Sequence, residues 1–157
     1  MRHVKNVLPI LSQTAHQLNI SIHAAVVGNA PDLPAYERVF QLMAAERVDG
    51  IVMIDSPEHF VNRASIVRFA AQYRMPTVYA FREFVQAGGL LSYGIDLAET
   101  GRRLAGMTVD IVSGKKPAEI PFYQHVKFQL SLNRATERTL GLEFPASVLA
   151  TADEVIE

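Results

Sequence analysis

Residues 50–80 read GIVMIDSPEHFVNRASIVRFAAQYRMPTVYA, and this stretch decides the fold class. It opens with Gly50-Ile-Val-Met-Ile54, an apolar run typical of a short strand that is covered on both faces of a sheet. Residues 57–73 then carry apolar side chains at helical spacing, and residues 77–80 form a second short β-rich run. A strand, a helix and a strand in this order predict a parallel βαβ unit.

The same alternation continues on both sides of this unit. Apolar periodicity predicts further helices at residues 9–18, 33–47, 83–87, 96–113, 133–140 and 145–150, and further strands at 20–27, 90–93 and 126–132. The acidic end, residues 151–157, is expected to be a short solvated tail. The pattern therefore predicts an α/β fold built on a doubly wound parallel sheet.

One feature departs from the usual doubly wound pattern, because the alternation begins with a helix. Such sheets usually begin with a strand, which takes a central place in the strand order 2-1-3-4-5. The residues ahead of Pro9 are too few and too polar to form that central strand. We therefore expect the first strand of the sheet to be missing.

Composition excludes several classes of protein. The 15 Lys and Arg residues are balanced by 16 Asp and Glu residues, which argues against a strongly basic nucleic-acid binder. The absence of cysteine removes disulfides, thiolate nucleophiles and cysteine-ligated metal sites. Lys5, Asn6 and Pro9 interrupt the apolar core that a secretory signal requires, so no signal peptide is expected in this chain.

Sequence patterns give little support to catalysis. There is no GxGxxG, P-loop or GxSxG motif, and the histidines at positions 3, 16, 23, 59 and 125 lack metal-ligand spacing. We therefore expect no catalytic residues, no metal and no cofactor. A small hydrolase-like enzyme is the least supported of the functions considered.

The candidate ligand-binding residues follow the ends of predicted strands. In parallel α/β sheets, ligands bind outside the carboxyl ends of the strands, where crossover loops and helix starts meet. Three such loops combine charged, hydroxyl and aromatic side chains: Asp55 and Ser56, then Phe81, Arg82 and Glu83, then Tyr93 and Asp96.

Each of these side chains also has a structural interpretation. Ser56 has the sequence context of a helix N-cap, and Asp96 with Glu99 has the spacing of a capping box. Arg82 could bind a carboxylate through its guanidinium or pair with a neighbouring acid. Tyr93 could stack on a ligand ring or lie half-buried in a strand.

A resemblance to a known family starts at these loops. Residues 82–96, REFVQAGGLLSYGID, resemble a signature of bacterial ABC-transporter substrate-binding proteins of the tryptophan/tyrosine-uptake-like type. Similarity extends over nearly the whole chain, through IVSGKKPAEIP at 111–121, VKFQLSLN at 126–133, LGLEFP at 140–145 and ADEVIE at 152–157.

The resemblance implies a periplasmic-binding-protein-like fold of type I, in which two α/β lobes close on a small solute. Members of the family are periplasmic or membrane-anchored, present the solute to an ABC permease, and perform no chemistry. An aromatic amino acid or a related organic anion is the solute class that the candidate residues suit. The partners expected are therefore the solute and the permease, with no nucleic acid.

Family members are longer than this chain, so the resemblance also implies a C-terminal portion without the N-terminal lobe. Residues 1–95 would form the second lobe without its first strand, and residues 96–157 would cross back toward the first lobe. Exposed sheet edges would then favour a swapped or edge-paired homodimer. The alternative hypothesis, suggested by the missing signal peptide, is a cytosolic ligand-sensing or regulatory domain on the same fold.

Overall fold

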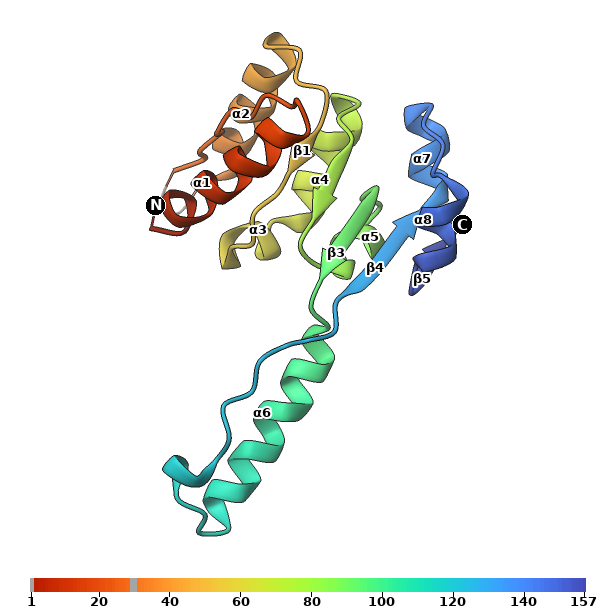
Figure 1. Ribbon diagram of the computed structural model, residues 1–157. Coiled ribbons are helices and arrows are strands. Elements are labelled where there is room, and N and C mark those ends of the chain that lie inside the picture. Colours follow the sequence, from red (N-terminus) through yellow and green to blue (C-terminus); the bar gives the residue numbers. More distant parts are fainter. Residues whose placement is uncertain (1, 29–30) are drawn as a thin grey trace.

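The computed structural model describes residues 2–28 and 31–157 (Figure 1). Its strands are short: β1 (Ile51–Val52), β2 (Thr77–Tyr79), β3 (Leu91–Gly94), β4 (Gln129–Asn133) and β5 (Glu154–Ile156). The helices are α1 (Arg2–Gln17), α2 (Leu33–Ala45), α3 (Pro57–Val61), α4 (Arg63–Gln72), α5 (Arg82–Gln86), α6 (Leu97–Val112), α7 (Arg134–Leu140) and α8 (Ala146–Thr151), with a 3₁₀ turn at Pro117–Glu119.

The strands form one sheet in the order β1-β2-β3-β4-β5. β1, β2 and β3 are parallel, as the sequence predicts, but β4 is antiparallel to β3 and parallel to β5. The predicted parallel sheet is therefore confirmed for three of the four strand pairs, and the β3–β4 pair is antiparallel. The chain leaves β3 through α6 and returns from the same direction, so β4 must run opposite to β3 (Figure 1).

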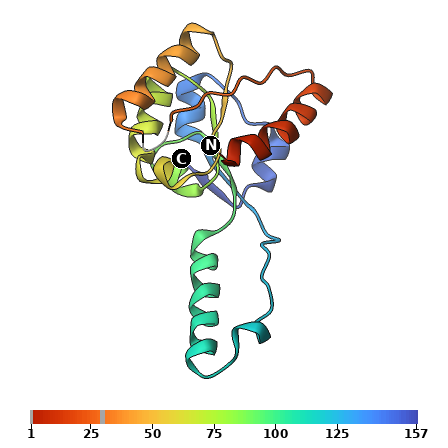
Figure 2. The ribbon, with the colours of Figure 1, turned by 90° about the vertical axis from the view of Figure 1, so that its left-hand side faces the viewer.

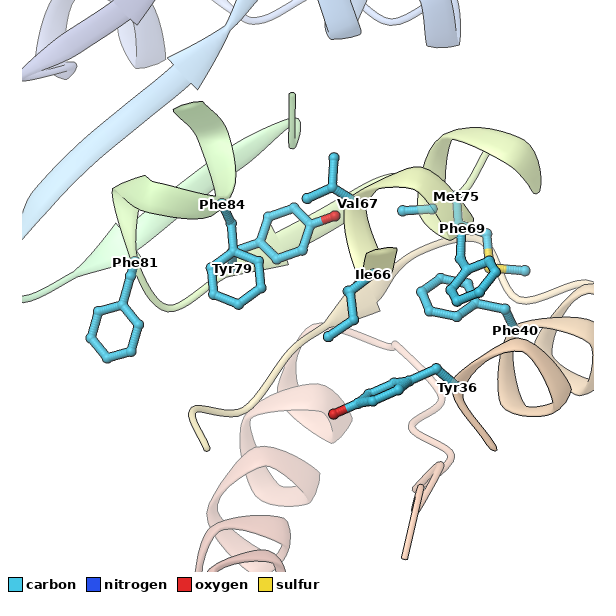
Figure 3. Packing of buried hydrophobic residues seen from close by; sticks show 10 residues of the cluster. Tyr36, Phe40, Ile66, Val67, Phe69, Met75, Tyr79, Phe81 and Phe84 are labelled. Carbon is cyan, nitrogen blue, oxygen red and sulfur yellow. The ribbon is translucent and has the colours of Figure 1, made fainter. Parts of the chain in front are cut away.

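Aromatic side chains dominate the main core cluster (Figure 3). Tyr36 and Phe40 of α2 pack with Phe69 of α4, and Tyr79 of β2 stacks on Phe84 of α5 with ring centroids 4.8 Å apart. Burial raises the pKa of Tyr79 to about 12, which keeps its hydroxyl neutral. This cluster fixes the helices α2, α4 and α5 against β2.

A smaller cluster holds the other end of the sheet, where Leu90, Leu132 and Phe144 are buried. Beside it lies Glu137, which is only 3% exposed, and such burial is unusual for a carboxylate. Its carboxylate accepts a hydrogen bond from the backbone N–H of Phe144 and lies 3.5 Å from Arg134 Nε. Glu137 therefore ties the loop after α7 to α7 itself.

The solvated tail expected at residues 151–157 is also wrong in part, because residues 154–156 form β5. The Asp153 carboxylate accepts a hydrogen bond of 2.9 Å from the Leu130 N–H, and β5 then pairs with β4. Glu157 lies 3.9 Å from Arg134 and 3.7 Å from Arg138. The tail is ordered because the free edge of β4 offers it a hydrogen-bonding partner.

The predicted strand at 20–27 is wrong as well. These residues are not helical and pair with no strand among the described residues. Val27 packs against the main core, but Ile20, Ile22 and Val26 are exposed. A strand needs a neighbour for its N–H and C=O groups, and the described part of the sheet offers this segment none.

Two predicted helices differ in extent. The helix expected at 57–73 is divided into α3 and α4 at Asn62, whose backbone leaves helical geometry. The helix expected at 9–18 begins earlier, so Pro9 lies inside α1 instead of in its first turn. Figure 2 shows α1 on the opposite side of the molecule from α2.

Residues 97–128, here called the arm, extend away from the sheet (Figures 1 and 2). The arm consists of α6 and an extended return segment, and no residue of α6 is buried. Arg103 lies over the Tyr123 ring at 4.6 Å, and Thr100 Oγ1 lies 3.2 Å from His125 Nε2. These contacts hold the return segment against α6.

Candidate functional site

The carboxyl ends of β1, β2 and β3 lie side by side, as they must in a parallel arrangement. The chain at the end of β3 approaches the end of β2 so closely that a Cβ on Gly94 would overlap the Ala80 carbonyl. This contact requires glycine at position 94. It brings the end of β3, with Tyr93 and the following Asp96, close to Arg82 at the start of α5.

The first group of candidate residues borders a shallow depression at the ends of β1 and β2. Asp55, Ser56 and Phe81 line it together with His59, which the sequence did not single out. Ser56 caps α3, since its Oγ accepts a 3.1 Å hydrogen bond from the His59 N–H. The capping interpretation of Ser56 is therefore confirmed, and Asp55 beside it is exposed.

His59 has a defined orientation in this group. Its Nδ1 lies 2.9 Å from the Ile54 carbonyl oxygen, which can only accept, so Nδ1 carries the proton of the neutral ring. The ring also packs edge-on against Tyr36 with centroids 5.8 Å apart. Nε2 is then the atom of neutral His59 that can accept a hydrogen bond.

Phe81 is less accessible than its position at a strand end indicated. It is 9% exposed and packs edge-on against Phe60 with ring centroids 5.8 Å apart. Its ring therefore belongs mainly to the core and forms only part of the lining of the depression.

The second group is charged and includes Arg82, Glu83 and Asp96. Arg82 Nε lies 4.0 Å from a Glu83 carboxylate oxygen, and it is buried without a hydrogen-bond partner among the described residues. Arg82 therefore does pair with a neighbouring acid, but the two side chains are 4.0 Å apart and form no hydrogen bond. The unsatisfied Nε leaves the guanidinium with hydrogen-bonding capacity to spare.

Asp96 caps α6, with Oδ1 accepting from the N–H groups of Ala98 at 2.8 Å and Glu99 at 3.3 Å. Desolvation would raise the pKa of Asp96, but these two N–H donors and the charges of Arg82 and Arg102 together hold it below its usual value. Only half of the predicted capping box forms, because the Glu99 carboxylate pairs with arginine: Arg102 lies at 3.0 Å.

Tyr93 is an exposed aromatic side chain at the same edge. It is 60% exposed and stacks on Phe128 of the return segment, with ring centroids 5.6 Å apart and planes inclined by 22°. Phe128 is also partly exposed. The pair forms an aromatic surface of the kind that stacks on a flat ring.

The structure therefore places the seven candidates in two neighbouring groups and adds His59, Phe128 and Gln129. Gln129 Nε2 lies 3.5 Å from Asp96 Oδ2, and the pairing of Gln129 with Gly94 across β3 and β4 explains this proximity. The sequence carried no signal for Phe128 or Gln129, because their position depends on the return of β4 to β3.

Two features are absent from the described residues, 2–28 and 31–157. In this part of the chain, no three His, Cys, Asp or Glu side chains are grouped so that they could hold a metal ion. Within the same ranges, no helix has both the length and the apolar character needed to cross a membrane.

The fold is similar to that of several solved structures. A conserved domain protein from Vibrio cholerae superimposes with a TM-score of 0.81 at 22% identity, over 97% of this chain and 50% of its own. An ABC domain from Streptococcus pneumonia in complex with L-Trp superimposes with a TM-score of 0.83 at 23% identity, over 97% of this chain and 51% of its own. A substrate binding protein with adhesive properties from Clostridium difficile, in its ligand-free, open structure, superimposes with a TM-score of 0.63 at 15% identity, over 98% of this chain and 50% of its own.

This chain thus spans about half the length of these structures. Among curated proteins, none matches it. The family described as "ABC transporter substrate binding protein" matches residues 2–156, almost the whole chain. The fold is therefore a partial binding-protein fold, and the chain belongs to the ABC transporter substrate binding protein family.

Proposed function

We propose that this chain forms one wall of a solute-binding cleft and serves, without catalysis, in solute uptake by an ABC importer. The observation that carries the proposal is the family match over residues 2–156. The candidate residues support it, because charged, hydroxyl and aromatic side chains gather at the carboxyl edge of β1–β3, where ligands of α/β sheets bind. A permease is the second partner expected, and an extracytoplasmic location follows from the same role.

The solute class proposed is an aromatic amino acid or a similar small organic ion. Tyr93 and Phe128 offer a surface for its ring, and the guanidinium of Arg82, whose side chain is 37% exposed, offers donors for its carboxylate. Asp55 is exposed beside them and can accept hydrogen bonds from an ammonium group. The L-Trp complex of the similar Streptococcus pneumonia protein supports this class.

The proposed cleft needs a second wall, since the similar solved chains are about twice as long as the part this chain covers. In this proposal residues 1–95 belong to one lobe, and the segment 96–157 starts with the arm, which reaches toward the other lobe. Because half of the contacts to the solute would come from that lobe, we expect the isolated chain to bind weakly.

Isothermal titration with L-tryptophan and L-tyrosine tests this proposal. We expect affinity weaker than micromolar, and we expect it to be abolished by Tyr93→Ala and by Arg82→Gln. Arg38→Gln is the matched control, because Arg38 is exposed on α2 and its loss removes the same charge.

Two results would count against the proposal. Binding that survives both site substitutions would place the solute elsewhere, and sub-micromolar affinity for any amino acid would contradict the need for a second wall.

A further inference from the structure

The shallow depression at the ends of β1 and β2 has an apolar and a polar part. Phe81 and Phe84, which belong to the main core cluster, contribute to its apolar lining (Figure 3). Its polar side chains are those of Asp55, Ser56 and His59. The hydrogen-bonding character of these three side chains decides which chemical group of a solute can bind there.

The Ser56 hydroxyl is already engaged both as an acceptor and as a donor. Its Oγ accepts a 3.1 Å hydrogen bond from the His59 N–H. The pKa of Glu58 lies below its usual value because its own backbone N–H and the Ser56 hydroxyl donate hydrogen bonds to its carboxylate. Ser56 therefore has no proton left to donate to a solute.

His59 contributes a hydrogen-bond acceptor to the depression. The Ile54 carbonyl oxygen, 2.9 Å from Nδ1, holds the proton of the neutral ring on that nitrogen. The edge-on contact with Tyr36 fixes the plane of the half-buried ring. Nε2 then carries a lone pair and no proton, so a solute must supply the proton of any hydrogen bond to this atom.

Asp55 contributes acceptors of the same kind. Its side chain is exposed beside Ser56 and His59, and a carboxylate accepts hydrogen bonds but donates none. The polar side chains described around the depression thus offer a solute acceptors and no donor. A solute group that fits them is itself a donor, and the charge of the Asp55 carboxylate favours a cation over a neutral group.

We propose that His59 is a specificity-determining residue, which binds the ammonium group of the solute together with Asp55 by accepting a hydrogen bond at Nε2. The inference rests on the proposed function and deepens it, because it restricts the solute class to compounds that carry an ammonium group. Arg82 supplies donors for the solute carboxylate, so the two charged ends of an amino acid meet different side chains.

The proposal predicts discrimination against a solute that lacks the ammonium group. Hydrogen bonds to charged groups contribute more to affinity than those between neutral groups. A site built to accept a hydrogen bond rejects an analogue without the donor, because its own polar atoms lose their partner. Indole-3-propionate is such an analogue of L-tryptophan, with the same ring and carboxylate and a hydrogen atom in place of the ammonium group.

NMR titration of the isotope-labelled chain with these two compounds tests the proposal. We expect L-tryptophan to bind about tenfold more tightly than indole-3-propionate. The ¹⁵N resonance of His59 Nε2 should shift on addition of L-tryptophan and stay in place with indole-3-propionate, since only the ammonium group donates to this atom. Both measurements use the unsubstituted chain.

Two substitutions of His59 separate its binding role from a structural one. His59→Asn keeps a donor for the Ile54 carbonyl and removes the acceptor, so we expect about tenfold weaker binding of L-tryptophan and unchanged binding of indole-3-propionate. His59→Gln places an amide oxygen near the position of Nε2 and should recover part of this loss. His16→Asn is the matched control, because His16 is exposed on α1.

The possible failures of the inference and of the proposed function differ. Equal affinities for the two compounds, or an Nε2 resonance that L-tryptophan does not shift, would overturn the role of His59 and leave the proposed function standing. Equal weakening of both compounds by His59→Asn would overturn it too, since a structural role has that effect. If neither compound binds, the proposed function fails and the inference fails with it. Should His59→Asn not fold, the two titrations of the unsubstituted chain decide.

Discussion

At the scale of single residues, Gly94 shapes the candidate site because it lets the end of β3 approach the end of β2. A methyl group at this position would overlap the Ala80 carbonyl, which belongs to the backbone and cannot move independently. We expect Gly94→Ala to lower the free energy of unfolding by about 3 kcal/mol. Urea denaturation followed by circular dichroism measures this difference.

Gly106→Ala is the matched control for this prediction. A Cβ at Gly106 would meet no atom within 4 Å, and the residue lies inside α6. Alanine should therefore be neutral there or stabilise the helix by about 0.5–1 kcal/mol. Equal losses at the two glycines would contradict the close approach described for Gly94.

Asp96 links the site to pH. Its pKa in the folded state lies below the unfolded value of 3.8, despite the opposing effect of desolvation, because of the α6 N–H donors and nearby arginines. The charge therefore contributes stability that is fully present well above pH 3.8 and is lost as the pH falls through the folded pKa.

Asp96→Asn tests this sign, because asparagine keeps an N-cap oxygen and removes only the charge. The free energy of unfolding, measured from neutral pH down to acid, should be higher for the unsubstituted protein than for Asp96→Asn at neutral pH. The two values should converge in acid, where Asp96 is protonated. A difference that is independent of pH would contradict the lowered pKa.

At the scale of elements, the arm has the least tertiary support. None of the residues of α6 is buried, and exposed apolar side chains line it, including Leu104, Val109 and Val112. Helix stability in proteins comes mainly from packing, so the α6 amides should exchange with solvent much faster than those of β3. Hydrogen-exchange mass spectrometry on the isolated chain measures both, and equal protection would contradict this view of the arm.

The elements also show which parts of the fold the sequence could predict. Helices such as α2, α6 and α7 were predicted nearly to their ends, because periodicity and caps such as Asp96 are local signals. Residues 20–27 were wrongly predicted to be a strand, because a strand needs a partner strand and the described residues offer them none. β5 was missed because its formation depends on pairing with β4, which lies far from it in the sequence. The local sequence pattern does not encode which strand will lie next to a given segment.

The candidate site likewise contains some residues that the sequence could predict and others that it could not. The positions of Asp55, Arg82 and Tyr93 followed from strand ends, which the sequence locates. Phe128 was not predictable, since its stacking on Tyr93 depends on the antiparallel return of β4. Phe81 was placed at the correct edge, but its burial results from packing against Phe60.

At the scale of the whole molecule, the chain exposes much apolar surface for its size. On the arm alone, Phe122 and Val126 are almost fully exposed in addition to the apolar side chains of α6. Surfaces of this kind favour association. We expect light scattering of the isolated chain to show a mass that increases with concentration, and Val112→Asp to reduce this increase.

The central claim, that a solute binds at the carboxyl edge of β1–β3, is tested most directly by NMR titration of the isotope-labelled chain with L-tryptophan. We predict weak, saturable shifts of the backbone amides of Ser56, Arg82, Tyr93 and Asp96, with no shift at Leu149 in α8. The claim would be contradicted if these amides did not shift up to the solubility limit of the amino acid, or if the shifts were confined to α7 and α8.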